Sequence, residues 1–205
     1  MSSKTPLIGS AWILLCSFGL SFLWNYSSQP GTEAQAPERF PAESLVPLAS
    51  EGFTLVMLAH PKCPCTRACI RELDRMMTEC RGAVTAHVLF LEPDAVDDAW
   101  TRSDLWRQAR SIPEVSVWAD HEGVEAARFG ATTSGQVIVY DSSGELVFRG
   151  GITPGRGHSG DNFGRSAITA LVRSGSSAMQ TTPVYGCPIF EEATSGSEGD
   201  STCKP

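Results

Sequence analysis

Residues 53–81 read FTLVMLAHPKCPCTRACIRELDRMMTECR and carry the strongest signals for both fold and function in this sequence. An apolar run of strand-forming residues, Phe53–Ala59, is followed by three cysteines and then by helical periodicity. Pro64 suits the first position of a helix, where its missing N–H costs nothing, so we expect Cys63 to be the N-cap. A helix N-terminus stabilises the thiolate, the form of cysteine that attacks disulfides and binds metal ions. The stretch therefore predicts a strand, a redox or soft-metal site, and a helix.

The remaining strand and helix signals alternate, which is typical of an α/β fold with a partly parallel sheet. Strands are expected at residues 53–59, 84–91, 115–119, 136–140 and 145–149. Helices are expected at residues 65–80, 94–111, 122–129 and 161–173. The last two strands flank the turn Asp141-Ser-Ser-Gly144 and should form a hairpin, which adds an antiparallel edge to the sheet.

The N-terminal part of the sequence predicts a membrane anchor. Residues 7–24 form a run of 18 residues without a charge, the lower end of what spans a bilayer. Lys4 precedes this run and Glu33 follows it, so the positive-inside rule puts the N-terminus in the cytoplasm. The rest of this single-pass chain would then lie on the extracytoplasmic, periplasmic side of the cell membrane. Two alternatives stay open: a cleaved signal peptide, suggested by the small-x-small motif at 34–36, and a buried hydrophobic helix.

Composition divides the chain into four expected parts. These are an anchor (1–24), a Pro-containing linker (25–44), a folded domain (45–175) and a tail (176–205). Within the tail, the apolar segment 183–190 is expected to dock on the domain and the rest to be disordered. The net charge is −7 and no basic cluster stands out, which excludes nucleic acid as a partner.

The order of these elements resembles the thioredoxin fold, which carries a Cys-x-x-Cys pair at the start of a helix. The apolar N-terminal run combined with HPKCPCTRA (60–68) and YDSSGELVFRGGITPGRGHSGDNFGR (140–165) resembles the membrane-anchored thioredoxin-like proteins of the RedB kind, related to the TlpA/ResA thiol-disulfide group. The resemblance covers residues 45–173. It implies a thioredoxin-like three-layer fold with a mixed sheet behind a transmembrane helix. It also implies a thiol-disulfide oxidoreductase that acts on exported proteins with thiols or disulfides and needs no cofactor.

Two departures from the family pattern affect the chemistry. The pair Cys63-Pro64-Cys65 has one intervening residue instead of two, so its disulfide closes a tighter and more strained ring, and strained disulfides are more oxidising. The family's cis-proline, which faces the cysteines and obstructs metal binding, is missing from residues 132–135, Thr-Thr-Ser-Gly. Its absence opens the predicted site to a metal.

The redox hypothesis assigns a role to each candidate residue. Cys63 would attack a substrate disulfide and Cys65 would resolve the mixed disulfide. His60 or His158 would assist proton transfer, and Arg156, in the Gly-rich loop, would lower a thiol pKa or hold an acidic substrate. Two further thiols, Cys69 and Cys187, are possible participants. The alternative for Cys69 is packing in the core, and the alternatives for Cys187 are burial or a disulfide with Cys203.

Other functions stay open at this point. Cys65, Cys69 and the distant His158 resemble the Cys-x3-Cys plus His set of the Sco copper chaperones, and thiolates with an imidazole suit copper. A non-catalytic anchored adaptor with permanent disulfides is a third hypothesis. A peroxidase is disfavoured, because Pro61, Thr66 and Cys69 approach the family pattern with one residue too many.

Overall fold

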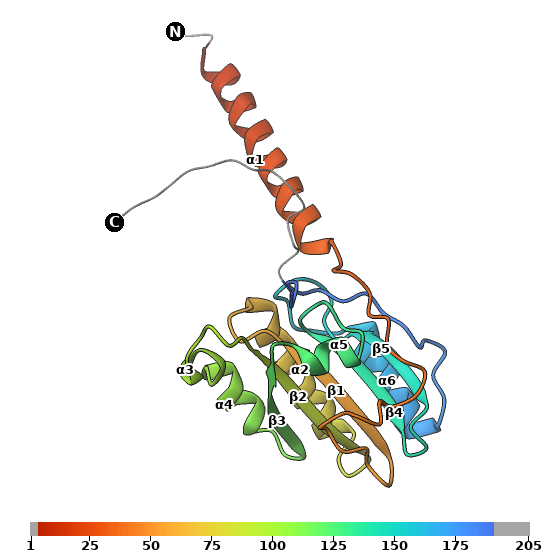
Figure 1. The fold of residues 1–205 in the computed structure, drawn as a ribbon. Coiled ribbons are helices and arrows are strands. Elements are labelled where there is room, and N and C mark those ends of the chain that lie inside the picture. Colours follow the sequence, from red (N-terminus) through yellow and green to blue (C-terminus); the bar gives the residue numbers. More distant parts are fainter. Residues whose placement is uncertain (1–3, 191–205) are drawn as a thin grey trace.

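The computed structural model describes the backbone of residues 4–190 and the side chains of residues 9–190. Five strands form one mixed sheet in the order β3-β2-β1-β4-β5 (Figure 1). β1, β2 and β3 are parallel, whereas β4 runs antiparallel to both β1 and β5. The strands are β1 (Phe53–Ala59), β2 (Val84–Glu92), β3 (Val115–His121), β4 (Gln136–Asp141) and β5 (Leu146–Gly151). This sheet confirms the predicted mixed α/β class and the predicted hairpin.

Six helices accompany the sheet in the described part of the chain. They are α1 (Lys4–Ser28), α2 (Pro64–Glu79), α3 (Asp98–Thr101), α4 (Asp104–Arg110), α5 (Val124–Arg128) and α6 (Phe163–Ser174). The single helix expected at 94–111 is wrong: it is divided into α3 and α4. The chain supplies two N-caps there, since the Asp97 side chain accepts from the Trp100 N–H and Ser103 has extended backbone before α4.

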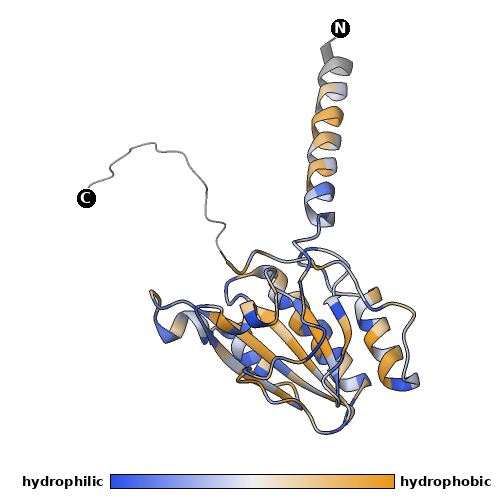
Figure 2. Cartoon of the chain, turned by 45° about the vertical axis from the view of Figure 1, so that its right-hand side comes forward, coloured by the Kyte–Doolittle hydropathy of each residue, from blue (hydrophilic) through white to orange (hydrophobic). Residues whose placement is uncertain are grey.

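Both faces of the central strand β1 are covered, which makes the fold three-layered. Side chains alternate along a strand, so Leu55 and Met57 enter one apolar cluster with α2, α4 and α6. Val56 and Leu58 enter a second cluster on the opposite face, together with α5. Figure 2 shows the strands as largely hydrophobic between these layers. The first cluster holds the cysteine-bearing helix α2 against the sheet.

The segment expected to be a linker is partly packed on the domain. Ala34 and Ala36 are buried in the second cluster, and the Tyr140 hydroxyl donates to the Pro37 carbonyl at 3.0 Å. The Gln35 N–H also donates to the carbonyl of Gly130 at 2.9 Å. The expected linker over 25–44 is therefore corrected for residues 34–37, which pack on the domain. The small side chains of Ala34 and Ala36 cover part of the sheet face that the short helix α5 leaves open.

α1 extends away from the sheet (Figure 1). Its apolar side chains, Trp12 and Phe18 among them, are exposed. Among the helices of the described part, none combines the length and the apolar character needed to cross a membrane. Residues 7 and 8, where the expected anchor begins, lie outside the described side chains. The transmembrane helix of the sequence prediction is thus not confirmed. The tail from 191 to 205, including Cys203, also lies outside the described residues.

Candidate functional site

The junction between β1 and α2 has the predicted form. Cys63 is the N-cap of α2, with extended backbone (φ −81°, ψ 123°), and Pro64 is the first helical residue. The Cys63 N–H donates to the His60 carbonyl at 3.1 Å, and the Thr66 hydroxyl donates to the same carbonyl at 3.0 Å. Because Cys63 lies outside the helix while Cys65 lies in its first turn, the two side chains can approach each other despite their one-residue spacing.

Three thiols meet at this junction, one of them from the far end of the chain. The sulfur atoms of Cys63, Cys65 and Cys187 all lie within 4.8 Å of one another. The Cys63 and Cys187 sulfurs are 2.9 Å apart, and all three side chains are free thiols. Cys63 and Cys65 are buried, at 2% and 7% exposure. We call these residues the thiol cluster.

The thiol cluster stabilises one negative charge, on Cys63. A hydrogen bond from Cys65 is the largest effect that lowers the pKa of Cys63, to about 4, although burial acts in the opposite direction. The Cys187 thiol and the backbone N–H groups of Thr66 and Cys187 lower it further. The same hydrogen bond to Cys63 raises the pKa of Cys65 far above its ordinary range. At neutral pH the cluster is therefore one thiolate with two protonated thiols directed at it.

Cys187 reaches the cluster on a segment that pairs with the loop before β4. We call residues 183–190 the C-terminal strap. The Ser134 N–H donates to the Cys187 carbonyl and the Ile189 N–H to the Thr132 carbonyl, both at 2.8 Å. An antiparallel bridge joins Thr133 and Pro188 between them. The strap thus runs as a short extended strand beside residues 132–134, and Val184 and Ile189 bury their side chains against the domain.

Two further contacts fix the strap at Gly186, immediately before its cysteine. Gly186 lies so close to the loop that a Cβ atom there would be 1.7 Å from the Ser134 carbonyl oxygen, which no side chain can tolerate. The Arg156 guanidinium donates to the Gly186 carbonyl at 2.6 Å and to the Gln29 carbonyl at 3.1 Å. Arg156 therefore holds the strap. Its charge acts to lower the pKa of Cys187, but burial outweighs it and that pKa is raised to about 11.

Ser134 lies within residues 132–135, where the family resemblance implies a cis-proline, and the described residues contain no cis peptide bond. Its hydroxyl accepts from the His60 N–H at 2.9 Å and shares a 2.8 Å hydrogen bond with the Thr66 hydroxyl. A proline could make neither of these contacts and could not donate to Cys187. Ser134 thus joins the end of β1, the start of α2 and the strap.

The two candidate histidines differ in their relation to the cluster. His60 is half-buried at the end of β1, and its ring packs edge-on against Trp100, with centroids 5.3 Å apart. Burial lowers its pKa, against a smaller opposing effect of Cys63. His158 is exposed and its Nδ1 lies 2.7 Å from the Arg156 carbonyl oxygen; within the described residues no hydrogen bond joins it to a thiol.

Cys69 lies in the core rather than in the thiol cluster. Burial raises its pKa to about 12, and a Cβ at Gly135 would be 2.6 Å from its sulfur. The copper set Cys65, Cys69 and His158 is therefore not the group that the fold assembles. In the described part of the chain, the cluster suited to a metal is Cys63, Cys65 and Cys187.

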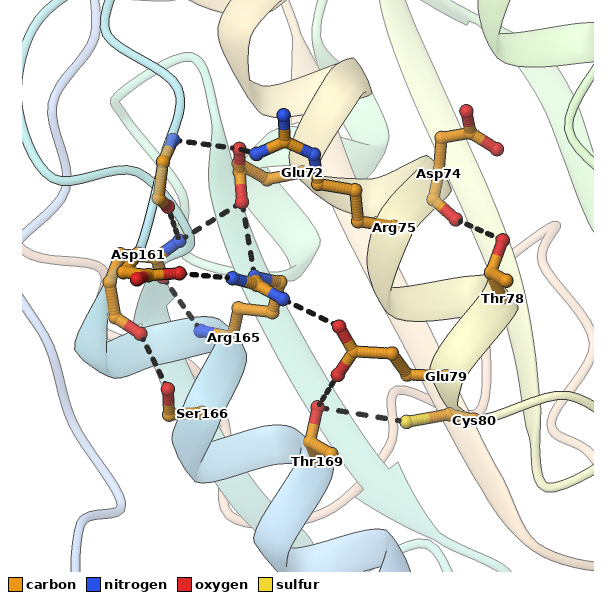
Figure 3. Close-up of polar contacts among 12 residues, drawn as sticks. Glu72, Asp74, Arg75, Thr78, Glu79, Cys80, Asp161, Arg165, Ser166 and Thr169 are labelled. Carbon is orange, nitrogen blue, oxygen red and sulfur yellow. Dashed lines mark hydrogen bonds and ion pairs between the residues drawn. The ribbon is translucent and has the colours of Figure 1, made fainter.

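A buried carboxylate secures the Gly-rich loop beside the site (Figure 3). Glu72 of α2 is fully buried and forms ion pairs with Arg75 at 2.8 Å and Arg165 at 3.1 Å. It also accepts from the Gly160 N–H at 2.9 Å and from Asn162, the N-cap of α6. This network ties α2 to α6 and to the loop that carries Arg156. A glutamate within an otherwise apolar helix face was the available sequence signal for it.

Solved structures of other proteins share the fold of this chain. No protein-family model and no curated protein matches the sequence. An uncharacterized conserved protein of Geobacillus kaustophilus is similar in structure, with a TM-score of 0.59, 17% identity, and coverage of 82% of this chain and 94% of that one. A hypothetical protein of Sinorhizobium meliloti is similar with a TM-score of 0.55, 19% identity, and coverage of 78% and 93%. These likenesses show the fold alone.

A secreted disulfide oxidoreductase of Mycobacterium tuberculosis is more distant, with a TM-score of 0.43, 14% identity, and coverage of 61% and 82%. The finer resemblance to RedB-type proteins stays a prediction.

Proposed function

We propose that this protein is a thiol-disulfide oxidoreductase in which Cys63 is the attacking thiolate and Cys65 the resolving thiol. One observation carries the proposal: Cys63, at the N-terminus of α2, has its pKa lowered to about 4 by a hydrogen bond from Cys65. Since thiolates are the reactive form, Cys63 is poised for exchange throughout the neutral range.

The reaction balances within these two residues and the substrate. The Cys63 thiolate attacks one sulfur of a substrate disulfide, and the other substrate sulfur leaves as a thiolate. Cys65 then gives up its proton and attacks the Cys63 sulfur. The Cys63–Cys65 disulfide forms, the second substrate sulfur is released, and the proton passes to a substrate thiolate. The substrate gains two electrons and the cysteine pair loses them; a reductant of the thiol class restores the pair, and the reverse sequence oxidises a dithiol substrate.

The order of the two attacks follows from the charge in the cluster. Cys65 stays protonated while Cys63 is an anion, because the hydrogen bond and the charge of Cys63 both raise the pKa of Cys65. When Cys63 enters a mixed disulfide it carries no charge, and both effects disappear. The pKa of Cys65 then falls toward its ordinary value, and the resolving thiol is activated only after the first step.

His60 is not arranged to act as the base. Its Nδ1 accepts from the Lys62 N–H at 3.2 Å, so the neutral ring carries its proton on Nε2. Burial lowers its pKa and keeps the ring neutral at neutral pH. The proton of Cys65 is therefore assigned to the departing substrate thiolate.

Disulfide exchange by the full-length chain tests the proposal. The wild-type protein should accelerate the reduction of insulin by dithiothreitol, and Cys63→Ser should abolish the acceleration. Cys65→Ser should trap a mixed disulfide between Cys63 and the substrate. Cys80→Ser is the matched control, because Cys80 is a buried thiol at the opposite end of α2. Full activity of Cys63→Ser would refute the proposal.

The proposed substrates are exported proteins with thiols or disulfides. Residues 7–24 are proposed to attach the chain to the cell membrane, with the domain on the periplasmic side. The uncharged run and the exposed apolar side chains of α1 support the attachment. Alkaline extraction of membranes from cells that express the full-length chain tests it. The chain should stay with the membrane fraction, and its release into the supernatant would contradict a single-pass anchor.

Cu(I) binding is a second candidate function, favoured by the mutual approach of three sulfurs within 4.8 Å. Thiolates are soft ligands that select Cu(I), and Cys63, Cys65 and Cys187 would supply them. Full-length protein loaded with Cu(I) and desalted should then retain the metal. Cys187→Ser should lose it, whereas His158→Ala should keep it. Loss of copper from the wild-type protein on desalting would exclude this function.

A further inference from the structure

The C-terminal strap covers the residue that the proposed function requires to be reactive, and the inference drawn from this rests on that function. Cys63 is only 2% exposed, and the Cys187 sulfur is in contact with it at 2.9 Å. A substrate disulfide must displace the strap to reach Cys63, whereas Cys187 is already beside it. Cys187 is thus placed where the sulfur of a substrate would have to be.

Backbone contacts on both sides of Cys187 hold its side chain beside Cys63. Thr132 and Ser134 pair with the strap as one strand pairs with another, which is how extended peptides add to the edge of a sheet. Gly186, immediately before the cysteine, permits an approach that any side chain would block. Earlier in the strap, the Val184 carbonyl accepts from the Gly31 N–H at 2.8 Å.

We infer that Cys187 is a third redox thiol of this site and exchanges with the Cys63–Cys65 disulfide to form an alternative disulfide, Cys63–Cys187. In this step Cys187 loses its proton and attacks the Cys63 sulfur. The Cys63–Cys65 bond breaks, and Cys65 leaves as a thiolate that takes up the proton. Cys187 is oxidised and Cys65 is reduced, so the step needs no oxidant beyond the substrate disulfide that oxidised the first pair.

The exchange gives the oxidised protein two states with different access to the site. With the Cys63–Cys65 disulfide, the strap is held by non-covalent contacts alone and a reduced substrate can displace it. With the Cys63–Cys187 disulfide, the strap is covalently fixed over Cys63. The second state keeps the oxidising equivalent within the protein while it excludes substrates.

Peptide mapping of the full-length chain distinguishes the two disulfides. Trypsin cuts after Lys62, Arg67 and Arg173, so Cys63 and Cys65 share the peptide 63–67 while Cys187 and Cys203 share 174–205. The chain with Cys203→Ser is equilibrated with glutathione buffers over a range of potentials, quenched with acid, alkylated and digested. A Cys63–Cys65 disulfide appears as an internally linked 63–67, and a Cys63–Cys187 disulfide as 63–67 joined to 174–205.

We expect both products in the Cys203→Ser chain and only the joined peptides when Cys65→Ser is added. Cys63→Ser with Cys203→Ser should give neither product. If Cys187 is alkylated at every potential while the Cys63–Cys65 disulfide forms and opens reversibly, the inference is overturned and the proposed function stands. If no disulfide forms in any of these chains, the proposed function fails as well.

Discussion

The sulfur atoms of Cys63 and Cys187 lie 2.9 Å apart although 124 residues separate them in the sequence. Cys63 is brought there by the start of α2, and Cys187 by the pairing of the strap with residues 132–134. The contact joins the most acidic thiol of the cluster to a thiol whose pKa is raised to about 11. The consequences of this arrangement can be measured on reduced protein, before any substrate is known.

The first prediction concerns the pH at which Cys63 ionises. The pKa of Cys63 is lowered to about 4, so its thiolate should be present at neutral pH and disappear as the pH falls through that value. The ultraviolet absorbance of thiolate in the reduced full-length chain should therefore show a step near pH 4 that Cys63→Ser removes. Titration of all thiols near the ordinary pKa of about 8.5 would contradict the cluster.

The second prediction separates the hydrogen bond of Cys65 from the other effects on Cys63. Since that hydrogen bond is the largest effect lowering the pKa of Cys63, Cys65→Ala should raise this pKa toward the ordinary value. Cys65→Ser keeps a donor and should raise it less. The same absorbance titration measures the pKa of Cys63 in both variants. Equal pKa values in Cys65→Ala and Cys65→Ser would show that the hydrogen bond from residue 65 does not lower the pKa of Cys63.

A third prediction tests the strap through Gly186. A methyl group in Gly186→Ala would meet the Ser134 carbonyl oxygen, and overpacking of this kind costs about 1–3 kcal/mol. The strap should be displaced more often, and the alkylation of Cys63 by iodoacetamide should become about tenfold faster. Gly19→Ala is the control, because a Cβ at Gly19 of α1 meets nothing within 4 Å. An unchanged alkylation rate in Gly186→Ala would show that the strap does not protect Cys63.

A fourth prediction concerns the two roles of Ser134. Ser134→Ala leaves the part-buried His60 N–H without its acceptor, which should lower the free energy of unfolding by about 1–3 kcal/mol, while the Thr66 hydroxyl keeps its hydrogen bond to the His60 carbonyl. The backbone N–H that binds Cys187 is kept, so the Cys63–Cys187 disulfide should still form. Ser134→Pro removes that N–H and should reduce the disulfide. Urea unfolding measures the first effect and peptide mapping the second; equal yields of the disulfide in both variants would argue against the backbone contact.

The fifth prediction concerns the buried carboxylate that supports the Gly-rich loop. Glu72→Gln removes the charge opposite Arg75 and Arg165, but Arg75 is exposed and Arg165 keeps its ion pairs with Glu79 and Asp161. The expected loss is therefore that of a hydrogen bond to a charged group, about 1.5–3 kcal/mol. Urea unfolding should show that loss, whereas Asp74→Asn, on the exposed side of the same helix, should change stability little. Similar stability of the two variants would show that the network is not required.

Local sequence signals were sufficient to predict the positions of Cys63 and Cys65, the first two members of the thiol cluster. An apolar strand, Pro64 at a helix start and two nearby cysteines act over a few residues, and the geometry of a helix N-terminus follows from them. The β4–β5 hairpin was predictable for the same reason, because its turn residues and alternating strands are contiguous. Long-range contacts left weaker signals: residues 34–36 resemble linker sequence, yet the two alanines fill a face of the sheet.

Local sequence patterns were enough to predict the mixed α/β fold and a cysteine at the N-cap of α2, since strand periodicity and helix capping act over a few residues. Which third group faces Cys63 depends on tertiary packing, because the contacting residues are far apart in the chain. Candidates in the sequence were His158, Cys69 and Cys187, and packing places Cys69 in the core and leaves His158 exposed. Cys187 is in contact instead, because Gly186 permits two backbone segments far apart in the chain to meet, and no local pattern encodes that approach.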